Sequence, residues 1–331
     1  MVQDTNILGR LNLKTQVLSE KLILTAAGAS KTNLLLAPMV YTTELLLLLK
    51  ANITTVAAVL KEDTLIRLIK TFVVKGSTQT YIDIGTPIHL ASLVKVRGDR
   101  YQADTVAAAG TADYFAILPI HLGIGKANNL KDFTVVLPDN SDTSLLQVEV
   151  QWGSAADLGT GVTINSVEIQ VAQSYLSLNP MQIQRAFRAG IRTPKITTSI
   201  YDLTSLQSNL GARYEVPVKS LLNRTIFTVV DSSGNRSNSQ ISEVGIINNI
   251  STEQPSKLPF ILAVQRTMAR HELLAMPTGI VCFEWGDIPG GTLDVGYDTK
   301  SLSSRELQIG ASIIATGGKV YVTETCIGKA R

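Results

Sequence analysis

The strongest constraint on the fold is an alternation of apolar and polar side chains that recurs along most of the chain. In one segment Leu146, Val148, Val150 and Trp152 alternate with glutamine and glutamate residues. Similar short segments are separated by clusters of proline, glycine, asparagine and aspartate. A side-chain period of two is that of a half-buried β-strand. Many short strands between turn residues predict a β-sandwich or a β-barrel.

Only a few segments have a helical pattern. A helix is predicted over Glu44–Leu60. Thr43 is a suitable N-cap for it, and the helix dipole favours an acidic residue such as Glu44 in the first turn. A second helix is predicted over Leu258–Leu274, where apolar residues recur at helical spacing and Pro277 follows. A third, shorter helix is predicted around Ala112–Ile117.

An internal repeat is indicated by the surroundings of the two tryptophans. Val148–Gly153 resembles Val281–Gly286 in the second half of the chain, and each segment ends in Trp-Gly. Two further pairs of segments match in the same order and at nearly the same separation along the chain: 168–172 with 306–310, and 81–84 with 214–218. Three ordered matches at nearly one offset predict a duplicated unit. Trp152 and Trp285 are therefore expected in matching strands of two cores.

The duplication divides the chain into four parts. We expect a partly helical N-terminal extension over 1–70, a first sandwich over 71–176, a basic linker over 177–199 and a second sandwich over 200–331. The segment 1–75 contains nine basic and five acidic side chains, and the linker contains four basic and no acidic ones. The net charge of +3 is too small to predict specific nucleic-acid binding.

These features together resemble the double jelly-roll major capsid proteins of tailless icosahedral viruses, the lineage of adenovirus hexon and the coats of membrane-containing phages. The resemblance rests on the segment 274–285, which passes from a helix end through a turn into a strand. It rests also on the strand 145–153 and on the closing strands 306–314 and 319–326. It covers about residues 70–331.

The resemblance implies an all-β fold of two tandem eight-stranded jelly-roll β-sandwiches, with a few short helices and an N-terminal extension. It implies a non-enzymatic viral coat protein without a cofactor, assembled in the host cytoplasm into the virion, for example of a bacteriophage. Homotrimers of pseudo-hexagonal outline would tile an icosahedral capsid. The partners would be other copies of the chain, neighbouring capsomers, minor capsid proteins and, where one is enclosed, an internal lipid membrane.

A tandem jelly-roll carbohydrate-binding or virion attachment protein is the alternative. Such a protein needs an exposed aromatic platform for a sugar or an acidic cluster for calcium. Aromatic residues make up only 5% of the chain, and no predicted loop carries an acidic cluster. The composition therefore favours the coat protein.

The apolar run near the N-terminus is the candidate contact with the inner side of a capsid or with lipid. Leu45, Leu46, Leu49 and Lys50 are the residues proposed for this inner-face or membrane-proximal contact, because the surrounding segment is basic. Burial in the core is favoured over contact with lipid, because the positive charges are spread out and the predicted helix has no clean charged face.

No catalytic, cofactor or metal site is predicted. His89, His121 and His271 are dispersed, and His271 lacks the second histidine of a zinc-protease helix one turn later. Cys282 and Cys326 have apolar, alternating neighbours and are predicted to be reduced strand residues that pack as small hydrophobes.

Overall fold

The computed structural model of the chain describes residues 13–24, 31–36, 41–76, 79–96, 101–122, 146–176, 192–217, 221–249, 256–285, 296–302 and 306–329. The chain forms two compact units. Unit 1 takes its residues from 1–90, 100–195 and 327–331, and unit 2 from 91–99 and 196–326. Among the described residues, no helix has the length and apolar character needed to cross a membrane.

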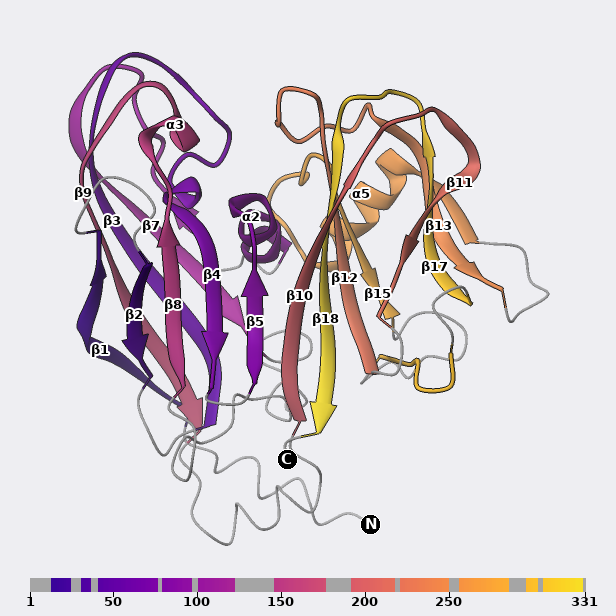
Figure 1. Cartoon of the computed structure of the whole chain (residues 1–331), viewed down its shortest axis with the longest axis horizontal. Helices are drawn as coiled ribbons and strands as arrows, with labels where there is room; N and C mark the ends of the chain where they lie inside the picture. Colours follow the sequence, from indigo (N-terminus) through magenta and orange to yellow (C-terminus); the bar gives the residue numbers. More distant parts are fainter. Residues whose placement is uncertain are drawn as a thin grey trace, which may run out of the picture. The chain divides into compact units, whose positions relative to one another are not determined.

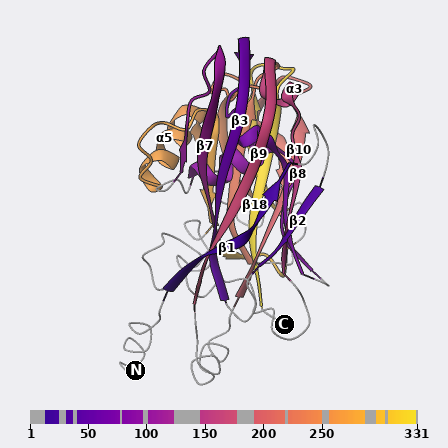
Figure 2. The same ribbon diagram turned by 90° about the vertical axis from the view of Figure 1, so that its left-hand side faces the viewer.

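Unit 1 consists of two antiparallel sheets (Figure 1). One has the strand order β1-β9-β3-β7-β6, and the other has the order β5-β4-β8-β2. Figure 2 shows β7, β3 and β9 side by side in the first sheet. The elements are β1 (Leu13–Ile23), β2 (Lys31–Leu35), β3 (Tyr41–Leu60), η1 (Ile66–Leu68), β4 (Ile69–Lys75), β5 (Thr80–Ile84), α2 (Pro87–Val96), β6 (Gln102–Ala103), β7 (Gly110–His121), β8 (Gln147–Trp152), α3 (Ala155–Leu158) and β9 (Gly159–Leu176). Residues of α2 from Ala91 onward belong to unit 2.

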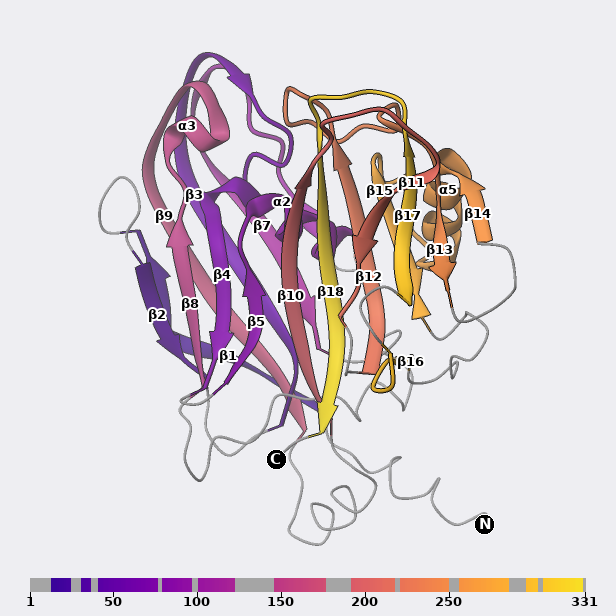
Figure 3. The ribbon, with the colours of Figure 1, turned by 45° about the vertical axis from the view of Figure 1, so that its right-hand side comes forward.

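Unit 2 also consists of two sheets, with the orders β15-β12-β18-β10 and β11-β17-β13-β14. The short strand β16 pairs with β12, and the helix α5 packs on β15, β13 and β14 (Figure 3). The elements are β10 (Arg192–Asp202), β11 (Gln207–Glu215), β12 (Leu221–Val230), β13 (Ile241–Asn248), β14 (Ser256–Pro259), α5 (Phe260–Arg270), β15 (Ile280–Glu284), β16 (Tyr297–Asp298), β17 (Leu307–Ile313) and β18 (Lys319–Lys329).

The two units share one strand topology. When the two-residue strands β6 and β16 are set aside, the described residues of each unit form eight strands. In both, the first, eighth, third and sixth strands are neighbours in one sheet, and the second, seventh, fourth and fifth are neighbours in the other. This order is that of the jelly roll, so the prediction of two eight-stranded jelly-roll sandwiches is confirmed.

The register predicted for the repeat is wrong. Trp152 ends β8, the seventh strand of unit 1, whereas Trp285 directly follows β15, the sixth strand of unit 2. The helices α2 and α5 correspond, because each connects the fifth strand to the sixth. Their first residues, Pro87 and Phe260, are farther apart in the chain than the two tryptophans are, so the offset between equivalent elements is larger than the predicted one. All half-buried strands share a period of two, so a match of non-equivalent strands produced a convincing but false offset.

The corrected register changes the N-terminal boundary. Residues 13–60 contain β1, β2 and β3, the first three strands of the first jelly roll, so they do not form an extension outside the sandwich. The helix predicted over Glu44–Leu60 is wrong, because this segment lies in β3 and pairs with β7 and β9. Five consecutive leucines fit a helix or a strand equally well, but the alternation from Leu49 to Thr54 is that of a strand.

The other helix predictions have mixed outcomes. Residues 112–117 lie in β7, so the helix predicted there is wrong. The helix predicted over 258–274 is confirmed as α5, although it is shorter. It ends with Glu272 in the left-handed conformation (φ 51°), and Leu273 donates a backbone hydrogen bond to the carbonyl of Met268. This is a Schellman-type end, which stops the helix before Pro277. Residues 177–191 of the predicted linker lie outside the described part of the chain.

The core of unit 2 is held by aromatic side chains from both sheets. Tyr214 on β11 makes edge-to-face contacts with Tyr201 on β10 and Phe227 on β12, at centroid distances of 5.0 and 5.1 Å. Phe227 makes a further edge contact with Phe283 on β15. Burial raises the pKa of Tyr214 to about 12, so its hydroxyl is neutral at physiological pH. The contacts join the two sheets through ring edges and faces, an arrangement that favours a fixed geometry.

Both tryptophans are core residues and anchor their units in the same chemical manner. Trp152 donates its indole N–H to Thr32 Oγ1 at 3.0 Å, and Trp285 donates its indole N–H to Thr225 Oγ1 at 2.8 Å. Each side chain is at most 1% exposed. Their shared burial confirms the core assignment, although their strands do not correspond.

Replacing either tryptophan should therefore destabilise the fold strongly. Trp152→Ala and Trp285→Ala are each expected to lower the free energy of unfolding by about 3–5 kcal/mol, because each leaves a large cavity. Thr225→Val keeps the volume but leaves the indole N–H of Trp285 unpaired, at a cost of about 1–3 kcal/mol. Urea unfolding measures all three. A loss below about 1 kcal/mol for either alanine variant would contradict the core assignment.

One carboxyl group is buried among apolar side chains of unit 2. Glu324 lies on β18 with the same parity as Val320, Val322 and Cys326, all of which belong to the core cluster. The side chain of Glu324 is buried, and its Oε1 has no hydrogen-bond partner among the described residues. Burial raises the pKa of Glu324 to about 8, so the carboxyl group is mainly protonated at neutral pH.

The protein should lose stability as pH rises because of Glu324. A pKa near 8 in the folded chain, against about 4.5 when unfolded, gives a contribution that is complete below pH 4.5 and is lost as pH rises to 8. The slope approaches about 1.4 kcal/mol per pH unit. Glu324→Gln should remove this slope from urea midpoints measured between pH 5 and 9. Glu215→Gln, at an exposed position on β11, is the control and should retain it. Equal slopes in wild type and Glu324→Gln would refute the assignment.

Candidate functional site

The residues predicted at the inner face lie in the first sheet of unit 1. Leu45 and Leu49 on β3 are at most 1% exposed. These two side chains are therefore buried in the core and are not available for contact with lipid. Leu46 is partly exposed, on the opposite side of the strand. Lys50 forms an ion pair with Asp113 at 3.1 Å and lies 5.7 Å from the ring centroid of Phe115. The four residues therefore do not form one membrane-facing surface.

Large apolar side chains are exposed on both units. On unit 1 the members with at least 49% exposure lie on β1, β2, β3 and β7: Val17, Ile23, Leu35, Val56, Val59 and Phe115. On unit 2 several exposed apolar residues lie in α5 or close to it in the chain: Leu258, Ile261, Leu262, Leu274 and Met276. Leu274 is fully exposed. Exposed large apolar side chains are candidates for contact with another protein.

A buried polar cluster lies where β3, β7 and β9 meet. His121 Nδ1 lies 3.2 Å from Glu44 Oε1, and Ser174 donates its hydroxyl to Glu44 Oε2 at 3.3 Å. The carboxylate stands between the imidazole and the hydroxyl. In a nucleophilic triad the histidine must contact the serine, so this order does not activate Ser174. The cluster is therefore best explained as cross-strand stabilisation.

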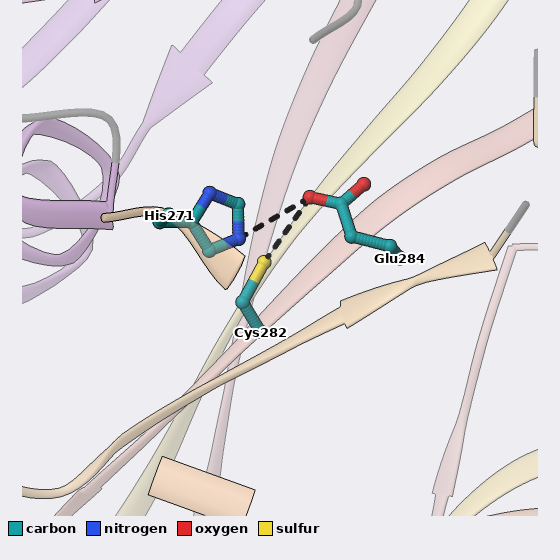
Figure 4. A group of neighbouring side chains, drawn as sticks. All are labelled: His271, Cys282 and Glu284. Atoms are coloured by element: carbon teal, nitrogen blue, oxygen red, sulfur yellow. Dashed lines mark hydrogen bonds and ion pairs between the residues drawn. The ribbon is translucent and has the colours of Figure 1, made fainter. Parts of the chain in front are cut away.

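A second polar cluster joins the end of α5 to β15. His271, the C-cap residue of α5, and Cys282 and Glu284 of β15 point toward one another (Figure 4). His271 Nε2 lies 3.4 Å from Glu284 Oε1, and Cys282 Sγ lies 3.7 Å from the same oxygen. Arg224 on β12 donates its Nε–H to this oxygen as well. The potential ligand atoms of the three residues all lie within 4.8 Å of one another.

Sequence reasoning missed this cluster. In the sequence, His271 lacks the second histidine of a helical zinc motif, and the neighbours of Cys282 predict only a small hydrophobe. The available signal was the spacing of Cys282 and Glu284, which places both side chains on one face of a strand. Nothing in the sequence indicated that the end of α5 would meet that face. Cys326, by contrast, is buried in the core of unit 2, as expected.

Two surface cavities bear on the carbohydrate-binding alternative. One, of about 340 Å³ in unit 1, is lined by Lys61, Asp63, Tyr101 and Asp104 among others. The other, of about 350 Å³ in unit 2, has no aromatic side chain among the described residues that line it. A sugar site usually presents an aromatic face with convergent polar groups. One tyrosine beside the first cavity is weak support for this alternative.

The fold defines the chain as a double jelly roll. The major capsid protein of STIV has the same fold, with a TM-score of 0.75, 13% identity, and coverage of 96% of this chain and 97% of that one. A chain in the atomic structure of Sulfolobus Turreted Icosahedral Virus has a TM-score of 0.73 and 14% identity, with coverage of 96% and 90%.

Other solved viral coats share the fold at lower similarity. The major capsid protein of Bacteriophage PM2 has a TM-score of 0.59 and 10% identity, with coverage of 97% of this chain and 98% of that one. A chain of the PBCV-1 virus capsid has a TM-score of 0.60 and 9% identity, with coverage of 97% of both chains. No protein-family model and no curated protein matches the sequence.

Proposed function

We propose that this chain is a viral major capsid protein with a structural, non-enzymatic role. The observation that carries the proposal is the double jelly-roll fold, shared over 96% of this chain and 97% of the STIV major capsid protein. The similarity extends through both units and is not limited to one sandwich. The proposed site of action is the virion, after assembly in the host cytoplasm.

The proposed mechanism is geometric. One chain with two similar jelly rolls has two similar lobes, so a homotrimer presents six. An object with threefold symmetry and six near-equivalent lobes can pack on a hexagonal lattice and, with curvature, tile an icosahedral shell. Minor capsid proteins are proposed as further partners of that lattice. An internal membrane, if the virion has one, would contact residues other than Leu45 and Leu49.

The surface composition supports extensive self-association. Charged residues make up only 17% of the chain, below the average for soluble domains. The exposed apolar residues around α5, Leu262 and Leu274 among them, would be covered in an assembly. Stable interfaces bury about 1,200 Å² or more and favour apolar residues at their centres.

The purified chain should be a trimer in solution. Light scattering after size-exclusion chromatography should give close to three times 35.7 kDa, and negative-stain images should show pseudo-hexagonal outlines. Obligate interfaces are large enough that the trimer should persist on dilution to micromolar concentration. A stable monomer that binds glycans would instead support the tandem carbohydrate-binding or attachment protein.

Charges introduced beside α5 should weaken the trimer. Leu262→Asp and Leu274→Asp are each expected to reduce association about 10-fold or more, because a carboxylate would be desolvated in an apolar contact. Both positions are exposed in the single chain, so folding should be retained. Ser232→Asp adds the same charge on an exposed turn and should leave the mass unchanged. Unaltered trimers in both leucine variants would place the interface elsewhere.

A further inference from the structure

The cluster of His271, Cys282 and Glu284 has the donor chemistry and the spacing of a metal site. The distances of 3.4 Å from His271 Nε2 to Glu284 Oε1 and 3.7 Å from Cys282 Sγ to Glu284 Oε1 are edges of a triangle of donors. A tetrahedral Zn²⁺ lies about 2.0–2.1 Å from nitrogen, 2.0–2.2 Å from oxygen and 2.3 Å from sulfur. For tetrahedral angles these lengths separate two ligand atoms by roughly 3.3–3.7 Å, and both distances in the cluster match that range. We propose that these three side chains bind one Zn²⁺.

The ligand-bearing segments are held in place by Thr267 of α5. The backbone N–H of His271 donates to the Thr267 carbonyl at 3.1 Å, and the backbone N–H of Cys282 donates to Thr267 Oγ1 at 2.8 Å. Thr267 is buried, and its hydroxyl donates in turn to the carbonyl of Ala263. One buried threonine thus fixes the helix end and the strand to each other. Positions fixed by packing and hydrogen bonds are what a metal site requires.

Arg224 is compatible with the site. Its Nε–H donates to Glu284 Oε1, and a carboxylate that binds a metal is commonly hydrogen-bonded in this way. A thiolate from Cys282, the carboxylate of Glu284 and the guanidinium of Arg224 together carry one negative charge, so the site with a divalent cation bound has a net charge of +1. The guanidinium orients Glu284, and the two anionic ligands bind the ion.

The donor set favours zinc over calcium and magnesium. Calcium and magnesium take oxygen ligands only, whereas thiolate, imidazole and carboxylate together suit Zn²⁺. The His271 and Glu284 side chains are 11% and 14% exposed, so solvent can reach the cluster and a water can occupy the fourth position. The ion would link the end of α5 to β15 and so stabilise unit 2. This role is independent of the proposed capsid function.

Cobalt binding tests the site directly. The full-length chain, stripped with a chelator and dialysed under reducing conditions, is titrated with Co²⁺ while its absorption spectrum is recorded. We expect one Co²⁺ per chain, with the intense visible bands of tetrahedral Co²⁺ and a thiolate-to-metal charge-transfer band, both abolished by excess Zn²⁺. Absence of saturable binding, or an octahedral spectrum without the thiolate band, would overturn the proposal.

Two cysteine variants provide a matched pair. Cys282→Ser should lose the thiolate band and weaken Co²⁺ binding at least about 10-fold, whereas Cys326→Ser, at the buried cysteine of β18, should keep both. Glu284→Gln is expected to weaken binding without removing the thiolate band. Retention of the band in Cys282→Ser would overturn the assignment.

Protection of the Cys282 thiol from alkylation tests the metal site in the wild-type chain. Zn²⁺ should slow alkylation of Cys282 by iodoacetamide at least about 10-fold, because a metal-bound thiolate is a poor nucleophile. Peptide mapping by mass spectrometry measures the rate of alkylation. Magnesium serves as the control ion and should not protect. Equal alkylation rates with zinc and with magnesium would refute the site even if the serine variant failed to fold.

Discussion

The fold depends on the burial of one face of each sheet against the other sheet of the same unit. In β3, Leu45, Leu47, Leu49, Ala51 and Ile53 are at most 1% exposed, while the residues between them are partly exposed. A slip of one residue in the pairing of this strand would exchange the two sets and expose the leucines. The burial of alternate residues therefore sets the register with both neighbours, β7 and β9, over nearly the whole strand.

Much of the architecture could be predicted from period-two alternation and turn residues, but the pairing of equivalent strands could not. Alternation shows that a segment such as Val148–Trp152 is a strand and which side chains face inward. The alternation does not indicate which strand of the jelly roll the segment forms, because any two half-buried strands have the same pattern. Trp152 and Trp285 shared a Trp-Gly sequence and a buried indole, and this likeness concealed their positions in the seventh and sixth strands.

The polar clusters were beyond sequence reasoning for a different reason. Cys282 and Glu284 are close in sequence, but His271 and Arg224 approach them only after α5 packs on β15 and β12 pairs with it. The same holds for Glu44 and His121, which are adjacent in the register of β3 and β7 although they are distant in the chain. The contacts that His271 and Arg224 make with β15, and the contact between Glu44 and His121, follow from the fold, so no local spacing in the sequence indicates them.

The order of strands in the first sheet also constrains how the protein is made. Leu13 at the start of β1 pairs with Leu176 at the end of β9, so β1 has no partner in its sheet until the ribosome has added the whole first jelly roll. At typical rates of synthesis this interval is roughly 10–30 s. During that time a strand with exposed Val17 and Ile23 has unsatisfied edges that favour association with other nascent chains. High-level expression of this chain is therefore expected to depend on chaperones that bind nascent chains.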